Sequence, residues 1–210
     1  VISAQTEQGS VVFEGNASVS FGSLKANGLQ NFFDDHSGLL NNSFKNTSLS
    51  LHAGYFIINN LSINLSLNYN YDVVNYDNSI YSDGNDSYLS YGIFSRYYIS
   101  NLWLWVQVGY KIGQPSKYRF LENVNYIALP IEYDGSETIP INTFLLDFGF
   151  SFFISPNISI NPTIGATRTT SSTEDIAFIR PDGQSTDQFF DLGRESICFK
   201  LSVGCILHLE

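Results

Sequence analysis

The sequence predicts an all-β fold: an eight-stranded antiparallel up-and-down transmembrane β-barrel, with three short periplasmic turns and four long extracellular loops. Three observations lead to this prediction. Apolar and polar residues alternate along eight segments, as in strands that have one face in lipid and one in a polar lumen. Short and long connections alternate between these segments. Charged residues make up 14% of the chain, whereas soluble domains carry about 25%.

The first half of the chain contributes four predicted strands, over residues 11–21, 48–57, 61–70 and 88–99. The third of these, LSINLSLNYN, has an apolar residue at every odd position and Ser or Asn at every even one. Asn59 and Asn60 directly precede it, and asparagine is typical of tight turns between strands. We therefore expect the second and third strands to form a hairpin.

The second half contributes four more, over residues 102–112, 144–154, 158–167 and 197–207. Residues 100–101 and 155–157 are predicted to be tight turns. Pro162 interrupts the alternation, and proline cannot donate a hydrogen bond to a strand ladder. We therefore expect a bulge or a local irregularity at Pro162.

The connections predict where the barrel stands. Bacterial outer-membrane barrels have short periplasmic turns, longer extracellular loops and an even number of strands. Each predicted strand has about 10 residues, the length that a tilted strand needs to cross a bilayer. We therefore expect an integral protein of the bacterial outer membrane with both termini in the periplasm.

Residues 1–5 are expected to be a remnant of a secretory signal or a periplasmic tail, because the small residue Ala4 follows an apolar start. Residues 6–210 are expected to form one barrel domain. Cys198 and Cys205 lie seven positions apart on one predicted strand, so their side chains should point to opposite faces and cannot form a disulfide with each other.

Six ionisable residues fall on the polar faces of the predicted strands and are expected inside the barrel: Glu14, His52, Arg96, Lys111, Asp147 and Lys200. A lone buried ion is costly, so these charges should be paired. We expect Asp147 to pair with Lys111 on the neighbouring strand. Glu14 is expected to meet Arg96 across the lumen.

Trp103 and Trp105 are predicted to point inward near the periplasmic rim and to obstruct the lumen. An eight-stranded barrel has an interior that side chains can fill. The polar lumen is thus expected to act as a plug. The alternative is a narrow gated ion pore, in which the salt bridges rearrange to admit ions.

The net charge of −10 is expected to lie mostly on the long loops. An acidic outer end would not attract nucleic acid. The loop after the third strand carries Asp77, Asp83 and Asp86, which we consider as a cation-binding loop, although the spacing lacks the ligand pattern of a calcium loop. The expected partners are the lipid bilayer, lipopolysaccharide and, as a further option, other outer-membrane proteins.

An enzymatic role is the less favoured interpretation. Asp35, His36 and Ser37 stand together in the first loop, but adjacent loop residues rarely form an oriented base and nucleophile. CxxC pairs and Cys/His metal spacing do not occur in the sequence. We therefore expect no enzyme activity, no cofactor and no bound metal.

The rival fold is a soluble barrel with the apolar face inward. Its outer surface would then consist of Ser, Asn, Gly and Thr with almost no charge, which is a poor soluble surface. The low content of charged residues favours the membrane interpretation.

Residues 91–98 (YGIFSRYY) and 150–158 (FSFFISPNI) are similar to strand-to-turn segments of small outer-membrane barrels. The chain resembles the OmpA/OmpX type over its length after the first few residues. Many members of that family end in an aromatic residue that the assembly machinery reads, whereas this sequence ends in Leu209 and Glu210. The resemblance implies a structural role or a surface-interaction role through the loops, or alternatively an accessory subunit of a larger outer-membrane complex.

Overall fold

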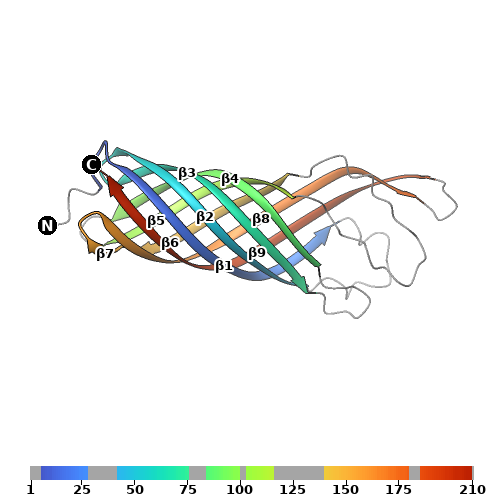
Figure 1. The fold of residues 1–210 in the computed structure, drawn as a ribbon. Coiled ribbons are helices and arrows are strands. Elements are labelled where there is room, and N and C mark those ends of the chain that lie inside the picture. Colours follow the sequence, from blue (N-terminus) through green and yellow to red (C-terminus); the bar gives the residue numbers. More distant parts are fainter. Residues whose placement is uncertain are drawn as a thin grey trace.

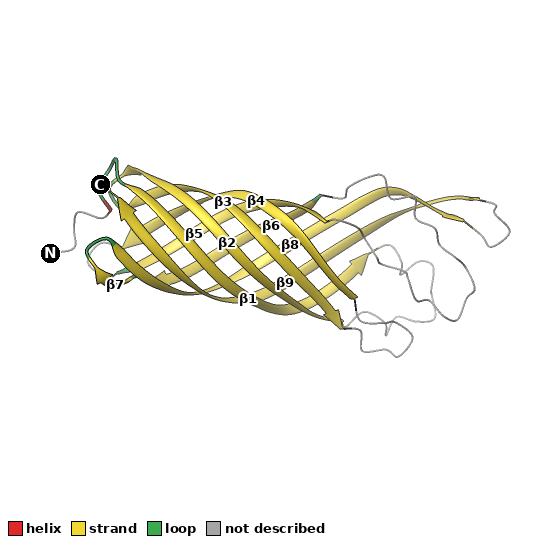
Figure 2. Ribbon diagram, viewed as in Figure 1, coloured by secondary structure: helices red, strands yellow, loops and turns green. Residues whose placement is uncertain are grey.

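Antiparallel strands make up almost all of the computed structural model, which describes residues 6–27, 42–75, 84–99, 103–115, 140–179 and 185–209. The strands wrap around one axis (Figures 1 and 2). They are β1 (Val11–Asn27), β2 (Asn42–Ile58), β3 (Leu61–Asn75), β4 (Gly84–Ile99), β5 (Leu104–Pro115), β6 (Ile141–Phe150), β7 (Phe152–Ser155), β8 (Ile158–Ile179) and β9 (Ser185–Leu209).

The sheet closes on itself as an eight-stranded barrel. Its order is β6-β5-β4-β3-β2-β1-β9-β8-β7, and an additional pairing joins β6 to β8. The segments β6 and β7 are two halves of one strand, because both pair with β8 on either side of Ser151. The predicted fold class is confirmed.

The strands are staggered around the barrel. If one starts at Glu14 and moves from each residue to its partner on the next strand, the path around the barrel returns to β1 at Leu24, ten residues beyond Glu14. This row runs through Glu14, His52, Ser66, Gly92, Lys111, Thr143, Thr169, Ser196 and Leu24. Such a stagger requires tilted strands. Side chains that meet across the lumen therefore come from different rows.

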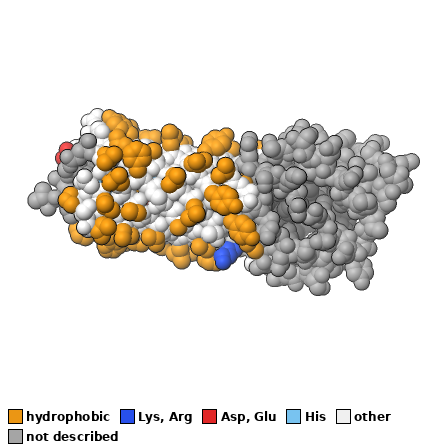
Figure 3. All heavy atoms as spheres, viewed as in Figure 1, with side chains coloured by type: hydrophobic (Ala, Val, Ile, Leu, Met, Phe, Trp, Pro, Cys, Tyr) orange, Lys and Arg blue, Asp and Glu red, His pale blue; other side chains and the backbone are white. Residues whose placement is uncertain are grey.

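The apolar face of each strand points outward and the polar face inward. Leu65 is 65% exposed and Phe148 is 51% exposed, while Asn64 and Asn68 are buried. Figure 3 shows hydrophobic side chains over the visible surface of the described barrel. The rival fold with an apolar interior is excluded by this orientation. None of the helical structure in the described residues is long and apolar enough to span a membrane.

The last connection is shorter than the sequence predicts. Strand β8 continues to Ile179 and β9 begins at Ser185, although residues 168–196 were expected to be a loop. The long ladder between these two strands contains register shifts beyond Thr173. Strand β3 also extends past the predicted end at residue 70, so that Asp72 lies within it with its side chain buried.

Pro162 does not shift the register of its own strand, β8, against β9. The pairing of β8 with β9 continues through Pro162 and Val203 without a shift. The irregularity lies on the other side, where the ladder to β6 ends at Gly149 and resumes in β7 at Phe152. The Asn161 amide nitrogen, in the orientation that fits its surroundings, reaches the Phe150 carbonyl oxygen at 3.2 Å. The expectation of a bulge or a local irregularity at Pro162 is therefore confirmed as an irregularity, which takes the form of an interrupted ladder and not of a bulge.

The N-terminal segment forms hydrogen bonds with the turn between β2 and β3. The Thr6 hydroxyl donates to Asn60 Oδ1 at 2.7 Å, and the Gln8 backbone N–H donates to Asn59 Oδ1 at 2.9 Å. Asn60 has a φ of 67°, a left-handed conformation that asparagine tolerates in a tight turn. The predicted turn at Asn59 and Asn60 is thus confirmed.

Candidate functional site

A continuous chain of hydrogen bonds runs from strand to strand along the inner surface of the barrel wall. Arg96 Nε donates to Gln107 Oε1 at 2.9 Å, and Gln107 Nε2 donates to Asp147 Oδ2 at 3.2 Å. The same Asp147 oxygen accepts from Lys200 Nζ at 2.8 Å. These residues lie in one row of cross-strand partners, in which Gly165 stands between Asp147 and Lys200.

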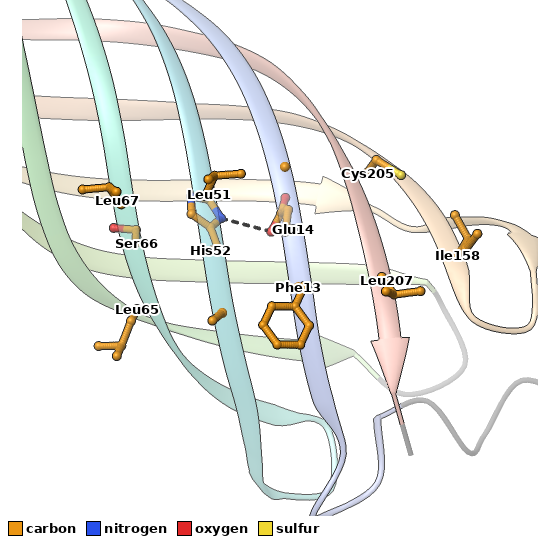
Figure 4. A pocket seen from close by; sticks show the side chains of 12 residues that line it. Phe13, Glu14, Leu51, His52, Leu65, Ser66, Leu67, Ile158, Cys205 and Leu207 are labelled. Atoms are coloured by element: carbon orange, nitrogen blue, oxygen red, sulfur yellow. Dashed lines mark hydrogen bonds and ion pairs between the residues drawn. The ribbon is translucent and has the colours of Figure 1, made fainter.

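Glu14 connects this row to the opposite wall. Its Oε2 accepts from Arg96 at 2.7 Å, and both side chains are almost fully buried. Its Oε2 also lies 3.2 Å from His52 Nδ1. Figure 4 shows the Glu14–His52 contact between β1 and β2. The expected contact of Glu14 with Arg96 across the lumen is confirmed.

Lys111 does not pair with Asp147, so that expectation is wrong. Lys111 is the cross-strand partner of Thr143, whereas Asp147 is the partner of Gln107, four residues nearer the turn end. Lys111 Nζ instead donates to Asn68 Oδ1 at 2.8 Å. The prediction had the right pair of strands but not their register.

An apolar cluster fills inward positions at the turn end. It consists of Val12, Phe56, Tyr98, Trp105 and Ile206, all nearly inaccessible. Arg96 links this cluster to the charged residues of the lumen. Its guanidinium lies 4.1 Å from the centre of the Trp105 ring and 3.4 Å from the Tyr98 hydroxyl. A cation over an indole face is attracted by the ring.

The two tryptophans differ in position. Trp105 points inward and is 2% exposed, as predicted. Trp103 is 52% exposed, so its assignment to the lumen is wrong. Strand β5 begins only at Leu104, and Trp103 lies in the preceding turn with a φ of 53°. The alternation of the strand therefore does not extend to Trp103.

Sequence reasoning missed two kinds of lumen residue. Gln107 lies on the polar face of the predicted strand 102–112 but is not among the six ionisable residues expected inside the barrel, because an amide carries no formal charge. Val12, Phe56 and Ile206 break the polar face at positions close to the short turns. Apolar residues at inward positions next to turns were the available signal for the cluster.

A depression of about 710 Å³ lies in the barrel wall, lined mainly by outward-facing side chains. Figure 4 shows Phe13, Leu51 and Leu65 around it. It forms where Gly15 and Ala53 replace larger residues on the outward face. Most of its lining is apolar, and Glu14, His52 and Ser66 contribute to it from the inward face.

Several predicted sites lie outside the described residues: Asp77, Asp83, residues 35–37 and residues 1–5. Asp86 lies in β4 opposite Asp72, but its side chain is not described. Within the described part of the chain, no group of three or more His, Cys, Asp or Glu side chains is placed to hold a metal ion. Cys198 is buried and Cys205 is exposed, so the two side chains lie on opposite faces of β9 and form no disulfide with each other, as their spacing predicts.

The fold is shared with known outer-membrane proteins. The outer membrane protein OprG from Pseudomonas aeruginosa matches with a TM-score of 0.55 and 11% identity, covering 97% of each chain. The outer membrane protein AlkL in lipid bilayers matches with a TM-score of 0.52 and 17% identity, over 99% of this chain and 93% of that one. No protein-family model and no curated protein matches the sequence.

Proposed function

We propose that this chain is an integral outer-membrane β-barrel with a plugged lumen, which acts by presenting its acidic loops as an interaction surface outside the cell. The apolar outward face supports membrane insertion, because the barrel would otherwise expose large hydrophobic side chains to water. The similarity in fold to OprG and AlkL agrees with this location. The proposed function is not catalytic.

The apolar cluster at the turn end is the observation that carries the plug. Its five side chains come from β1, β2, β4, β5 and β9, and therefore reach inward from most of the circumference. The buried contact of Glu14 with Arg96 lies next to this cluster, on the side away from the turn end. An ion that crosses the barrel would have to displace both, and removing a partner from a buried pair is strongly unfavourable.

Conductance in planar lipid bilayers tests the plug. The refolded protein should give no steady openings, whereas a double substitution Phe56→Ala and Trp105→Ala should produce them by opening the turn end. Phe148→Ala is the matched control, because it removes a ring from the lipid face. Reproducible openings of the unsubstituted protein would instead favour a gated pore.

Isolation from native membranes tests the interaction role. The protein should sediment with the outer membrane in a density gradient and should be recovered in mild detergent as a solitary barrel. Deleting residues 120–135 in the loop between β5 and β6 should leave the barrel folded and reduce the binding of the purified protein to lipopolysaccharide, the expected surface partner. A stoichiometric membrane companion that survives this deletion would make the chain an accessory subunit.

A further inference from the structure

The depression of about 710 Å³ in the barrel wall is elongated and follows the rows of cross-strand partners. Its outward-facing lining residues belong to two neighbouring rows, which cross five adjacent strands from β8 to β3. The row nearer the turn end consists of Ile158, Leu207, Phe13, Ala53 and Leu65. Figure 4 shows this course from Ile158 to Leu65.

Small residues leave the middle of the depression open. A β-carbon placed at Gly15 would meet no atom within 4 Å beyond its own chain neighbours. Ala53 lines the depression from the next strand. Leu51 is the cross-strand partner of Gly15, Leu65 is the partner of Ala53, and both leucines are exposed. Two large side chains therefore stand beside a hollow at Gly15 that no described side chain fills.

The outward part of the lining carries no charge, because its residues are apolar apart from Gly15 and the thiol of Cys205. Glu14 and His52 contribute from the inward face, but the Glu14 carboxylate is bound by Arg96 at 2.7 Å and lies 3.2 Å from His52 Nδ1. These polar groups belong to the lumen network. A ligand on the outward side would therefore meet hydrocarbon side chains, which suit a hydrocarbon chain and not an ion.

The depression extends from the turn end to the middle of the strands. Ile158 is the first residue of β8, and Leu67, in the second row, is near the middle of β3. Four strand spacings of about 4.8 Å make the depression about 19 Å long. With strands tilted by about 45°, its rows climb about 13 Å along the barrel axis. One leaflet contributes about 15 Å of hydrocarbon, so the depression spans most of one leaflet.

We propose that the depression binds one acyl chain of a phospholipid from the leaflet at the turn end, with the headgroup near Ile158 and the chain end near Leu67. A lipid tail gains no hydrophobic energy by moving from bilayer to barrel, because both surroundings are apolar. Its retention depends on van der Waals packing in the hollow at Gly15. This site rests on the proposed membrane insertion, and it does not depend on the plug or on the loops.

Native mass spectrometry tests the site on the full chain, inserted into vesicles of phosphatidylethanolamine and phosphatidylglycerol and extracted in mild detergent. The unsubstituted barrel should carry one phospholipid molecule. The double substitution Gly15→Leu and Ala53→Leu should lower the retained fraction about tenfold, the factor that about 1.4 kcal/mol of binding energy gives, because the new side chains occupy the hollow. Ala166→Leu is the matched control, since Ala166 is exposed on β8 outside the depression.

Cys205 offers a second measurement, because its exposed thiol lies in the lining. Adding phosphatidylethanolamine to the delipidated barrel in micelles should slow the alkylation of Cys205 by N-ethylmaleimide. The double variant should lose this lipid dependence, and Ala166→Leu should keep it. These two readouts support the site only if they agree.

Flotation of the vesicles separates the two proposals. A barrel that floats with the vesicles but retains no phospholipid overturns the lipid site and leaves membrane insertion intact. A barrel that does not float overturns the membrane function and the site with it. The site is also overturned if a dimer appears in place of the lipid adduct, or if the double variant retains as much lipid as the control.

Discussion

Lys200 Nζ lies 2.8 Å from Asp147 Oδ2 although β8 stands between their strands. Gly165 occupies the intervening position in the same row. A side chain at Gly165 would overlap the Asp147 carboxylate and the Leu146 backbone. The glycine therefore permits an ion pair between strands that are not neighbours, and the lumen network depends on this opening.

Gly165→Ala should destabilise the barrel by about 1–3 kcal/mol, because the added methyl overpacks the lumen and displaces the Asp147 carboxylate. Urea unfolding in lipid vesicles measures the change. Gly15→Ala is the control: its new methyl would meet no atom within 4 Å, so its effect should stay within about 0.5 kcal/mol. Equal effects of the two substitutions would contradict the role assigned to Gly165.

Removing either partner of the Glu14–Arg96 pair should cost about 3–5 kcal/mol, because it leaves the other charge buried without compensation. Glu14→Gln and Arg96→Met are the single variants. The double variant should be less destabilised than the sum of the two, by a coupling of about 0.5–3 kcal/mol. A double-mutant cycle from unfolding curves measures this coupling, and strict additivity would show that the contact is not energetically important.

The two tryptophans should differ in quenching. Trp103→Phe leaves only the buried Trp105, whose fluorescence should resist acrylamide. Trp105→Phe leaves the exposed Trp103, which should be quenched strongly by acrylamide or by brominated lipid at the interface. Stern–Volmer slopes measured on both variants test this assignment. Similar slopes would mean that Trp103 also points into the lumen.

A charge on the outward face should cost more at mid-strand than near a turn. Leu65 and Ile154 are equally exposed, at 65% and 66%, but Leu65 lies within β3 and Ile154 next to the end of β7. Leu65→Arg should destabilise the barrel in vesicles by about 2–4 kcal/mol, and Ile154→Arg by about 0–1 kcal/mol. An equally small cost at both positions would contradict the membrane-spanning orientation.

The strand pattern was readable from the sequence because its period of two is a local property. Each strand has one apolar outward face and one polar inward face, and the neighbours Leu65 and Asn64 show this alternation without reference to any other strand. The turn at Asn59 and Asn60 was readable for the same reason. The exact strand ends were not, since β8 and β9 continue far beyond their clear alternation by pairing with each other.

The partners of the charged lumen residues could be identified only once the register between the strands was known. The sequence places Lys111, Asp147 and Lys200 inside the barrel, but it does not state which residues stand opposite each other across the wall. A shift of four residues along β6 decides that Thr143 lies opposite Lys111 and that Asp147 lies in the row of Lys200.

The sequence by itself determined which side chains face outward and which face the lumen, because alternation along a strand fixes the direction of each side chain. Only the closed barrel decided which inward residues meet, because its stagger brings distant rows to one height. The buried contact of Glu14 on β1 with Arg96 on β4 follows from that closure. Contacts across a lumen depend on every strand in the ring, and no local pattern encodes them.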